Sequence, residues 1–230
     1  MVAGPARPVP RFRHTRDHGW VTFWHPTRME IVLNPIPTPL IWEVAPASWQ
    51  DGDDGCLTVV AGPRTDLFVD PAGAEPVLTA PRLLGPVPSG DFQLSARVRV
   101  GFAATYDAGC LLLYAGPTTW AKLAYERSPQ GAGMVVSVIT RGVSDDANGF
   151  VVPAEAPLWL RVSRLGPAWA FHASTDGVRW HFVRHFRLDA TAEPLRIGFE
   201  AQSPTGEGCT AVFDRIGFEA TRLGDLRDGR

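Results

Sequence analysis

Residues 92–100 alternate strictly between apolar and polar side chains, and this period of two is the feature that most constrains the fold. The apolar positions are Phe92, Leu94, Ala96, Val98 and Val100. Because successive side chains of a β-strand point to opposite faces, the pattern predicts a strand with one face in a core and the other in water.

Short apolar runs separated by Pro, Gly and Asp make up most of the remaining sequence. They predict further strands within residues 29–33, 40–44, 56–61, 110–126, 133–141, 157–165, 168–174, 194–202 and 209–220. Asp176-Gly177 lies between two apolar runs and predicts a hairpin with a type I′ turn. The acidic segments 48–55 and 144–149 favour turns over calcium sites. About a dozen short strands and essentially no helix predict an all-β fold of antiparallel sheets stacked face to face.

The composition argues against several function classes. The chain of 230 residues has a formal net charge of -2, so neither nucleic acid nor a membrane surface is an expected partner. No apolar run resembles a signal peptide or a membrane helix, and three cysteines without C-x-x-C spacing indicate buried thiols in a reducing, cytoplasmic environment. The pairs His14/His18 and His181/His185 come without further ligands, and no nucleotide-binding motif occurs. Neither a metal nor a cofactor is therefore predicted.

The chain divides into three parts by composition. Residues 1–28 are rich in Arg, Pro and His, and they predict an N-terminal arm that is partly ordered at most. Residues 29–220 predict the β-sandwich, and residues 221–230 form a C-terminal tail.

Several motifs follow one another in an order that resembles a known family. They are "YDAGCLLLY", "WAKLAYE", "VVSVITRGVSDD", "STDGVRW" and "IGFEAQSPTGEG". The sequence is similar to the regulation-of-enolase-like family, a domain-of-unknown-function group in the concanavalin A-like lectin/glucanase superfamily. The matching positions are Tyr106, Asp107, Trp120, Lys122, Glu126, Thr140, Ser144, Asp145, Ser174, Asp176, Gly177 and Trp180, whereas Ala108, Ala124 and Asp146 depart from the family pattern. The resemblance implies a concanavalin A-like jelly-roll sandwich of two curved antiparallel sheets.

Lys122 is the one lysine among 22 basic residues, and it lies in a predicted strand. Trp120, Lys122 and Glu126 would share one face of that strand, while the apolar residues between them would face the core. A tryptophan platform beside charged groups suits a sugar-like ligand, and the alternative is a solvated ion pair worth about 0 to 1 kcal/mol. Lys122→Arg is expected to impair ligand binding and to change the stability by about 1 kcal/mol or less.

The sequence predicts binding of a carbohydrate or a similar polyhydroxylated small molecule in a groove of the sandwich, without chemistry. The candidate ligand-binding residues are Tyr106, Asp107, Trp120, Lys122, Glu126, Thr140, Glu200 and Gln202. One alternative is a glycoside-hydrolase-like enzyme with Asp107 and Glu126 as its two carboxylates, or an enzyme that uses Lys122 as a low-pKa amine. A structural alternative for Asp107 is the capping of a turn. A further alternative for the whole chain is an intracellular protein-interaction module.

Overall fold

The computed structural model describes residues 30–52, 55–154, 156–189 and 193–230. The predicted N-terminal arm and the pair His14/His18 lie outside these residues. Within them the chain forms 17 strands and no helix, which confirms the all-β prediction. The described residues accordingly contain no helix that could span a membrane.

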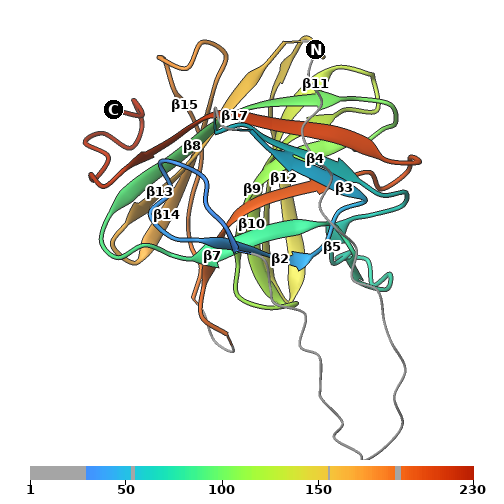
Figure 1. Ribbon diagram of the computed structural model, residues 1–230, viewed down its shortest axis with the longest axis horizontal. Helices are drawn as coiled ribbons and strands as arrows, with labels where there is room; N and C mark the ends of the chain where they lie inside the picture. The colour runs from blue at the N-terminus through green and yellow to red at the C-terminus, as the bar shows by residue number, and fades with distance from the viewer. Residues whose placement is uncertain (1–29, 53–54, 155, 190–192) are drawn as a thin grey trace, which may run out of the picture.

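Two large antiparallel sheets pack face to face, as Figure 1 shows. Sheet A contains, in spatial order, β1 (Glu30–Ile31), β2 (Leu40–Val44), β7 (Arg82–Pro86), β16 (Arg196–Gln202), β9 (Ala108–Tyr114), β10 (Thr119–Arg127), β11 (Gly133–Arg141) and β12 (Val143–Val152). Sheet B contains β15 (His181–Arg187), β14 (Ala168–Ser174), β13 (Leu158–Leu165), β8 (Phe92–Gly101), β17 (Cys209–Glu219), β4 (Leu57–Ala61) and β3 (Ser48–Asp51). The predicted sandwich of two antiparallel sheets is therefore confirmed.

The core between the sheets is built from alternate residues of the central strands. On β8 the apolar row from Phe92 to Val98 is at most 1% exposed, while the residues between are half-buried, so the predicted alternation is confirmed. Phe199 of β16 and Phe213 of β17 meet across the two sheets, with ring centroids 5.0 Å apart. Burial of such aromatic pairs stabilises the sandwich without any disulfide.

Two acidic segments that the sequence predicts as turns are strands. Residues 48–51 form β3 at the edge of sheet B, and residues 143–152 form β12 at the edge of sheet A. Edge strands tolerate polar side chains because much of their surface stays in water. The turn prediction is wrong for residues 144–149 and for residues 48–51 because a polar composition suits an edge strand as well as a turn. It holds after β3, where the Gly55 N–H donates to the Gly52 carbonyl at 2.9 Å.

The hairpin predicted at Asp176-Gly177 is confirmed, since β14 and β15 pair antiparallel. Its connection is longer than a two-residue turn and spans residues 175–180. Gly177 has a φ of 75°, and the Asp176 carboxylate accepts hydrogen bonds from the backbone N–H groups of Val178 and Arg179 at 2.8 Å each. The type I′ prediction is wrong because the aspartate side chain closes a wider turn.

Residues 62–81 cross the outer face of sheet A, and we call them the covering segment. They include the short paired strands β5 (Leu67–Phe68) and β6 (Val77–Leu78), which the sequence does not predict. Leu67 and Ala80 are fully buried in an apolar cluster with side chains of β9, β10 and β11. Part of the outer face of sheet A is therefore closed to solvent by the chain itself.

Candidate functional site

A row of polar and aromatic side chains lies on the outer face of sheet A along β10. Trp120, Lys122 and Glu126 belong to this row, while the residues between them point into the inter-sheet core, as strand alternation predicts. The row lies between β9 and β11, so its charged residues are away from the sheet edges.

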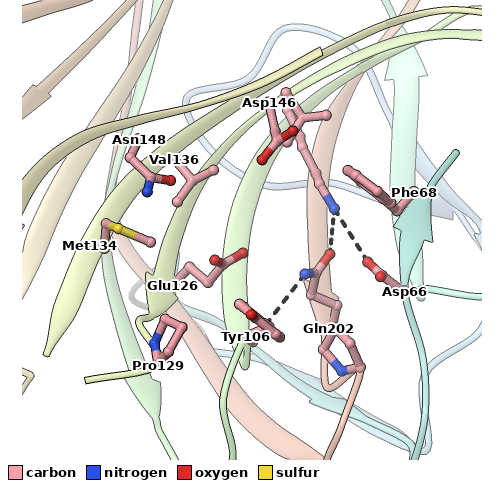
Figure 2. A pocket seen from close by; sticks show the side chains of 13 residues that line it. Asp66, Phe68, Tyr106, Glu126, Pro129, Met134, Val136, Asp146, Asn148 and Gln202 are labelled. Atoms are coloured by element: carbon pink, nitrogen blue, oxygen red, sulfur yellow. Dashed lines mark hydrogen bonds and ion pairs between the residues drawn. The ribbon is translucent and has the colours of Figure 1, made fainter. Parts of the chain in front are cut away.

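A pocket of about 400 Å³ lies on this face beside the covering segment (Figure 2). Its polar lining residues are Asp66, Tyr106, Lys122, Glu126, Asp146, Asn148 and Gln202. Its apolar lining residues are Phe68, Pro129, Met134, Val136, Val138 and Pro204. The fold thus gathers the covering segment, three loops and strands β10, β11, β12 and β16 around one small volume.

Lys122 lines the pocket but is 2% exposed. Its ammonium group donates hydrogen bonds to the backbone carbonyl of Leu67 at 2.8 Å and to Oε1 of Gln202 at 2.5 Å. Carboxylate oxygens of Asp66 and Glu200 lie 3.6 and 3.9 Å from Nζ. These contacts join the covering segment to β16 around one compact charge, which a planar guanidinium would not reproduce.

The electrostatic surroundings keep the Lys122 amine protonated. Burial lowers its pKa, but the nearby carboxylates of Glu200, Asp66 and Glu126 outweigh burial and hold the pKa above the ordinary value of a lysine. A low-pKa amine would require the opposite shift, so the enzymatic role considered for Lys122 has no support in this structure.

Glu200 and Gln202 follow one another on the outer face of β16, and they have different roles. Gln202 lines the pocket and holds Lys122. Glu200 is 1% exposed and does not line the pocket. Burial raises the pKa of Glu200, and the Lys122 charge opposes that shift. Glu200 is therefore a buried countercharge for Lys122, and the structure does not place it among the residues that line the pocket.

Glu126 lines the pocket, is 8% exposed, and forms no hydrogen bond or ion pair with the residues that the structure describes. Burial raises its pKa to about 7, although the Lys122 charge acts in the opposite direction. The carboxylates of Asp66, Glu200 and Asp146 raise it further. Near neutral pH this group can accept a hydrogen bond, bind a cation or exchange a proton with a ligand.

Tyr106 lines the pocket, whereas Asp107 does not. Tyr106 is 41% exposed and adopts a φ of 69°. Asp107 lies at the same end of the hairpin as Glu126, as predicted, but it is fully buried. Its carboxylate accepts hydrogen bonds from two backbone N–H groups of the preceding turn and from the Ser203 hydroxyl. Asp107 thus caps a turn, as the structural alternative predicts, and the structure does not bring it to the pocket lining.

Trp120 and Thr140 are on the predicted face but outside the pocket lining. Trp120 is 0% exposed beneath the covering segment, so the predicted tryptophan platform is not open to a ligand. The Thr140 hydroxyl forms a hydrogen bond with the Ser144 hydroxyl at 2.9 Å, and Ser144 accepts another from the N–H of Val69. These contacts attach the covering segment to sheet A, and the structure places neither Trp120 nor Thr140 at the pocket.

Four of the polar and aromatic pocket residues were not predicted from the sequence. Asp146 and Asn148 alternate along β12 and share its pocket face, so reading residues 143–152 with a period of two would have found them. Asp66 and Phe68 come with the covering segment. No local sequence pattern places that segment over sheet A.

No group of three or more His, Cys, Asp or Glu side chains in the described part of the chain is arranged to hold a metal ion. His181 and His185 both lie on β15 in sheet B.

The sequence matches, over residues 42–221, the family described as "Protein of unknown function (DUF1349)". A search of curated proteins found no match to the chain.

Three solved structures illustrate the range of proteins with this fold. A functionally unknown protein from Saccharomyces cerevisiae is 23% identical with a TM-score of 0.69, covering 79% of this chain and 96% of that one. A mutant of the GH43 protein BlXynB from Bacillus licheniformis is 18% identical with a TM-score of 0.61, covering 79% of this chain and 37% of that one. The carbohydrate binding module CBM66 from Bacillus subtilis is 12% identical with a TM-score of 0.50, covering 77% of this chain and 94% of that one. The chain thus spans little more than a third of the GH43 protein, and these likenesses establish the fold alone.

Proposed function

The chain belongs to this DUF1349 family, and we propose from its own pocket that it binds a carbohydrate or a similar polyhydroxylated small molecule. The observation that carries the proposal is a pocket in which aromatic and apolar walls adjoin amide and carboxyl groups. A sugar presents apolar C–H faces together with hydroxyl groups, so a site for it needs both kinds of lining.

The polar and aromatic lining residues suit this class of ligand. Tyr106 and Phe68 supply aromatic surface, while Asn148 and Glu126 supply hydrogen-bonding groups that have no partner among the described residues. A volume of about 400 Å³ falls within the range of small-molecule sites. The carbohydrate binding module of the same fold supports the proposal only through the shared scaffold, because one fold serves many functions.

A second candidate function is hydrolysis of a glycosidic bond, and Glu126 is the observation that favours it. With a pKa of about 7, its carboxyl group is partly protonated at neutral pH, as a general acid has to be. Asp107 is engaged in its turn, so Asp146 of β12 is the partner carboxylate to test. Turnover of aryl glycosides by the wild type, abolished in Glu126→Gln, would establish this function over binding alone.

Calorimetric titration with a panel of mono- and disaccharides tests the binding proposal. Tyr106→Ala and Asn148→Ala are expected to weaken binding about tenfold, since each removes one contact worth about 1.4 kcal/mol. Asp145→Ala is the matched control, because Asp145 is the neighbour of Asp146 on β12 but pairs with Arg184 at 2.6 Å. Absence of any sugar binding, or equal affinity in all variants, would contradict the proposal and favour a protein-interaction module.

A further inference from the structure

The pocket carries more negative than positive charge. Three of its lining residues, Asp66, Glu126 and Asp146, are carboxylic acids, and Lys122 is the one basic residue among the described lining residues. Carboxylates around a recess raise the local concentration of cations and disfavour anions. The lining therefore favours a cationic ligand over an anionic one.

The one positive charge is already engaged by the protein. Lys122 donates to the Leu67 carbonyl and to Gln202, and its remaining donor faces the carboxylates of Asp66 and Glu200. An acidic ligand could reach this ammonium only by displacing contacts that hold the covering segment. Lys122 is therefore not a receptor for a ligand carboxylate or phosphate.

Two of the carboxylates, by contrast, are unengaged. Neither the Glu126 nor the Asp146 carboxylate forms a hydrogen bond or an ion pair with the described residues; Glu126 is 8% exposed, whereas Asp146 is exposed to solvent. Figure 2 shows the Glu126 carboxylate directed into the pocket, with Asp146 and Asn148 along its β12 side. A nearly buried carboxylate without a partner is costly until a donor or a cation joins it.

We propose that the ligand is a polyhydroxylated molecule with a protonated primary amine, whose ammonium group pairs with Glu126 and Asp146 while its hydroxyls contact Asn148 and the aromatic wall. This inference rests on the proposed function and names the class of ligand for that site. An ammonium group has three donors and no acceptor, which complements carboxylate and amide oxygens. The absence of a metal-ligand group among the described residues favours an organic cation.

Two matched series of probes test the proposal by calorimetry at about pH 7.5. The first is glucamine, glucitol and gluconate, and the second is glucosamine, glucose and glucuronate. The amine of either series is expected to bind at least about tenfold more tightly than its neutral relative, and the acid is expected to bind least. Equal binding of amine and neutral compound overturns the amine proposal but leaves the proposed function standing. Binding by no member overturns both.

Variants assign the effect to the two carboxylates. Glu126→Gln and Asp146→Asn should each weaken the binding of the amine about tenfold and leave the neutral compound within about twofold. Asp145→Asn is the control, because its side chain pairs with Arg184 away from the pocket. Equal losses for the amine and the neutral compound would contradict an ammonium site. Thermal unfolding of each variant shows whether it is folded.

The pH dependence of ligand affinity distinguishes a direct contact between Glu126 and the ligand from a purely structural role of Glu126. Lys122 on the same strand, Asp66 on the covering segment, Glu200 on β16 and Asp146 on β12 all act on Glu126, and its pKa lies at about 7. Because glucamine stays protonated up to about pH 9, its affinity should fall about tenfold from pH 8 to pH 6 as Glu126 takes up a proton. Glucitol should show no such change, and Glu126→Gln should flatten the glucamine profile. A wild-type profile that is already flat overturns the role of Glu126.

Discussion

The two sheets each bury a cation on their outer face, and the two cations are held in different ways. On sheet A, Lys122 lies under the covering segment among carboxylates. On sheet B, Arg161 of β13 lies under residues 222–230 and is 6% exposed. It donates to the backbone carbonyl of Gly229 at 2.6 Å, and its guanidinium lies 4.1 Å from the ring centre of Trp180.

The titration behaviour of the two regions differs accordingly. Carboxylates hold the pKa of Lys122 above its ordinary value, whereas burial lowers the pKa of Arg161 to about 10. His172 lies opposite Arg161 in register and donates to the carbonyl of Leu226. Burial lowers the pKa of His172 to about 4, although that hydrogen bond opposes the shift. Sheet A therefore stabilises the charge of its buried lysine, whereas burial in sheet B disfavours the charged forms of Arg161 and His172.

This difference favours a ligand-binding site on sheet A, whereas the C-terminal residues simply cover the outer face of sheet B. On sheet B, Arg161 and His172 each donate one hydrogen bond to a backbone carbonyl of the C-terminal residues, and a carbonyl carries no net charge. The covering segment of sheet A instead brings Asp66 to a pocket that keeps further unpaired carboxylates. A bound ligand can neutralise unpaired carboxylates, and this favours sheet A as the ligand-binding side.

The largest expected effect is that of Lys122→Met. Removing the ammonium leaves Glu200 buried without its countercharge and leaves the Leu67 carbonyl without its donor. Breaking a buried pair from one side costs about 3–5 kcal/mol. Urea unfolding at pH 7.5 measures this loss of stability.

Arg161→Met is the control for that variant on the other sheet. The carboxylate that acts on the pKa of Arg161 is Glu219, which is exposed, so removing Arg161 leaves no buried countercharge unpaired among the described residues. The expected loss is about 1 kcal/mol, from one hydrogen bond and the stacking on Trp180. Equal losses for the two variants would show that the sheets do not differ in charge compensation.

Deleting residues 222–230 is expected to have the next largest effect. The truncation removes the acceptors of Arg161 and His172 and the buried side chain of Leu223, which is 4% exposed. The loss should be about 2–3 kcal/mol, with ligand affinity unchanged because the pocket is on the other sheet. Calorimetric unfolding measures the loss of stability, and titration with the bound sugar measures the affinity. A large loss of affinity without a loss of stability would contradict the separation of the two regions.

The pH dependence of stability should have opposite signs in the two regions. His172 has a folded pKa of about 4, below its ordinary value of 6.5, so its contribution is lost as the pH falls through this window. Glu126 has a folded pKa of about 7, above its ordinary value of 4.5, so its contribution is lost as the pH rises. Between pH 6.5 and pH 4.5 each contribution changes by about 2 kcal/mol, and the two nearly cancel.

Two variants separate these opposing contributions. Acidification from pH 6.5 to pH 4.5 should cost Glu126→Gln about 2 kcal/mol more than it costs the wild type. It should cost His172→Gln about 2 kcal/mol less than it costs the wild type. Urea unfolding at a series of pH values measures both. Parallel profiles for all three proteins would mean that neither pKa is shifted as described.

Much of the fold could be predicted from the sequence because strand signals are local. The alternation in residues 92–100 and the apolar runs identify the central strands from neighbouring residues alone. The polar edge strands β3 and β12 were mistaken for turns, since Asp, Asn and Gly suit both. Local composition identifies a strand reliably where one of its faces is buried, and poorly where both faces are exposed to solvent.

The candidate site was predicted in part, and the errors share one physical cause. Tyr106, Lys122, Glu126 and Gln202 line the pocket as expected. The expectation that Lys122→Arg changes the stability by about 1 kcal/mol or less assumed an exposed pair. Lys122 is 2% exposed because the covering segment lies over it, so a larger loss is now expected. Long-range burial of this kind leaves no local trace in the sequence.

The smallest expected effect concerns Trp120, the residue that the sequence placed at the floor of the site. Trp120 is fully buried, its indole Nε1 has no hydrogen-bond partner among the described residues, and Lys122 Nζ lies 5.6 Å from its ring centre. Trp120→Phe keeps an aromatic ring and removes the unpaired N–H, so the lost packing and the relieved donor should offset each other to within about 1 kcal/mol. Sugar affinity should be unchanged, whereas Tyr106→Ala should weaken it, because the Tyr106 ring lines the pocket. A tenfold loss of affinity in Trp120→Phe at unchanged stability would show that the covering segment opens to expose the tryptophan. Trp120 would then belong to the ligand-binding site together with the residues that line the pocket.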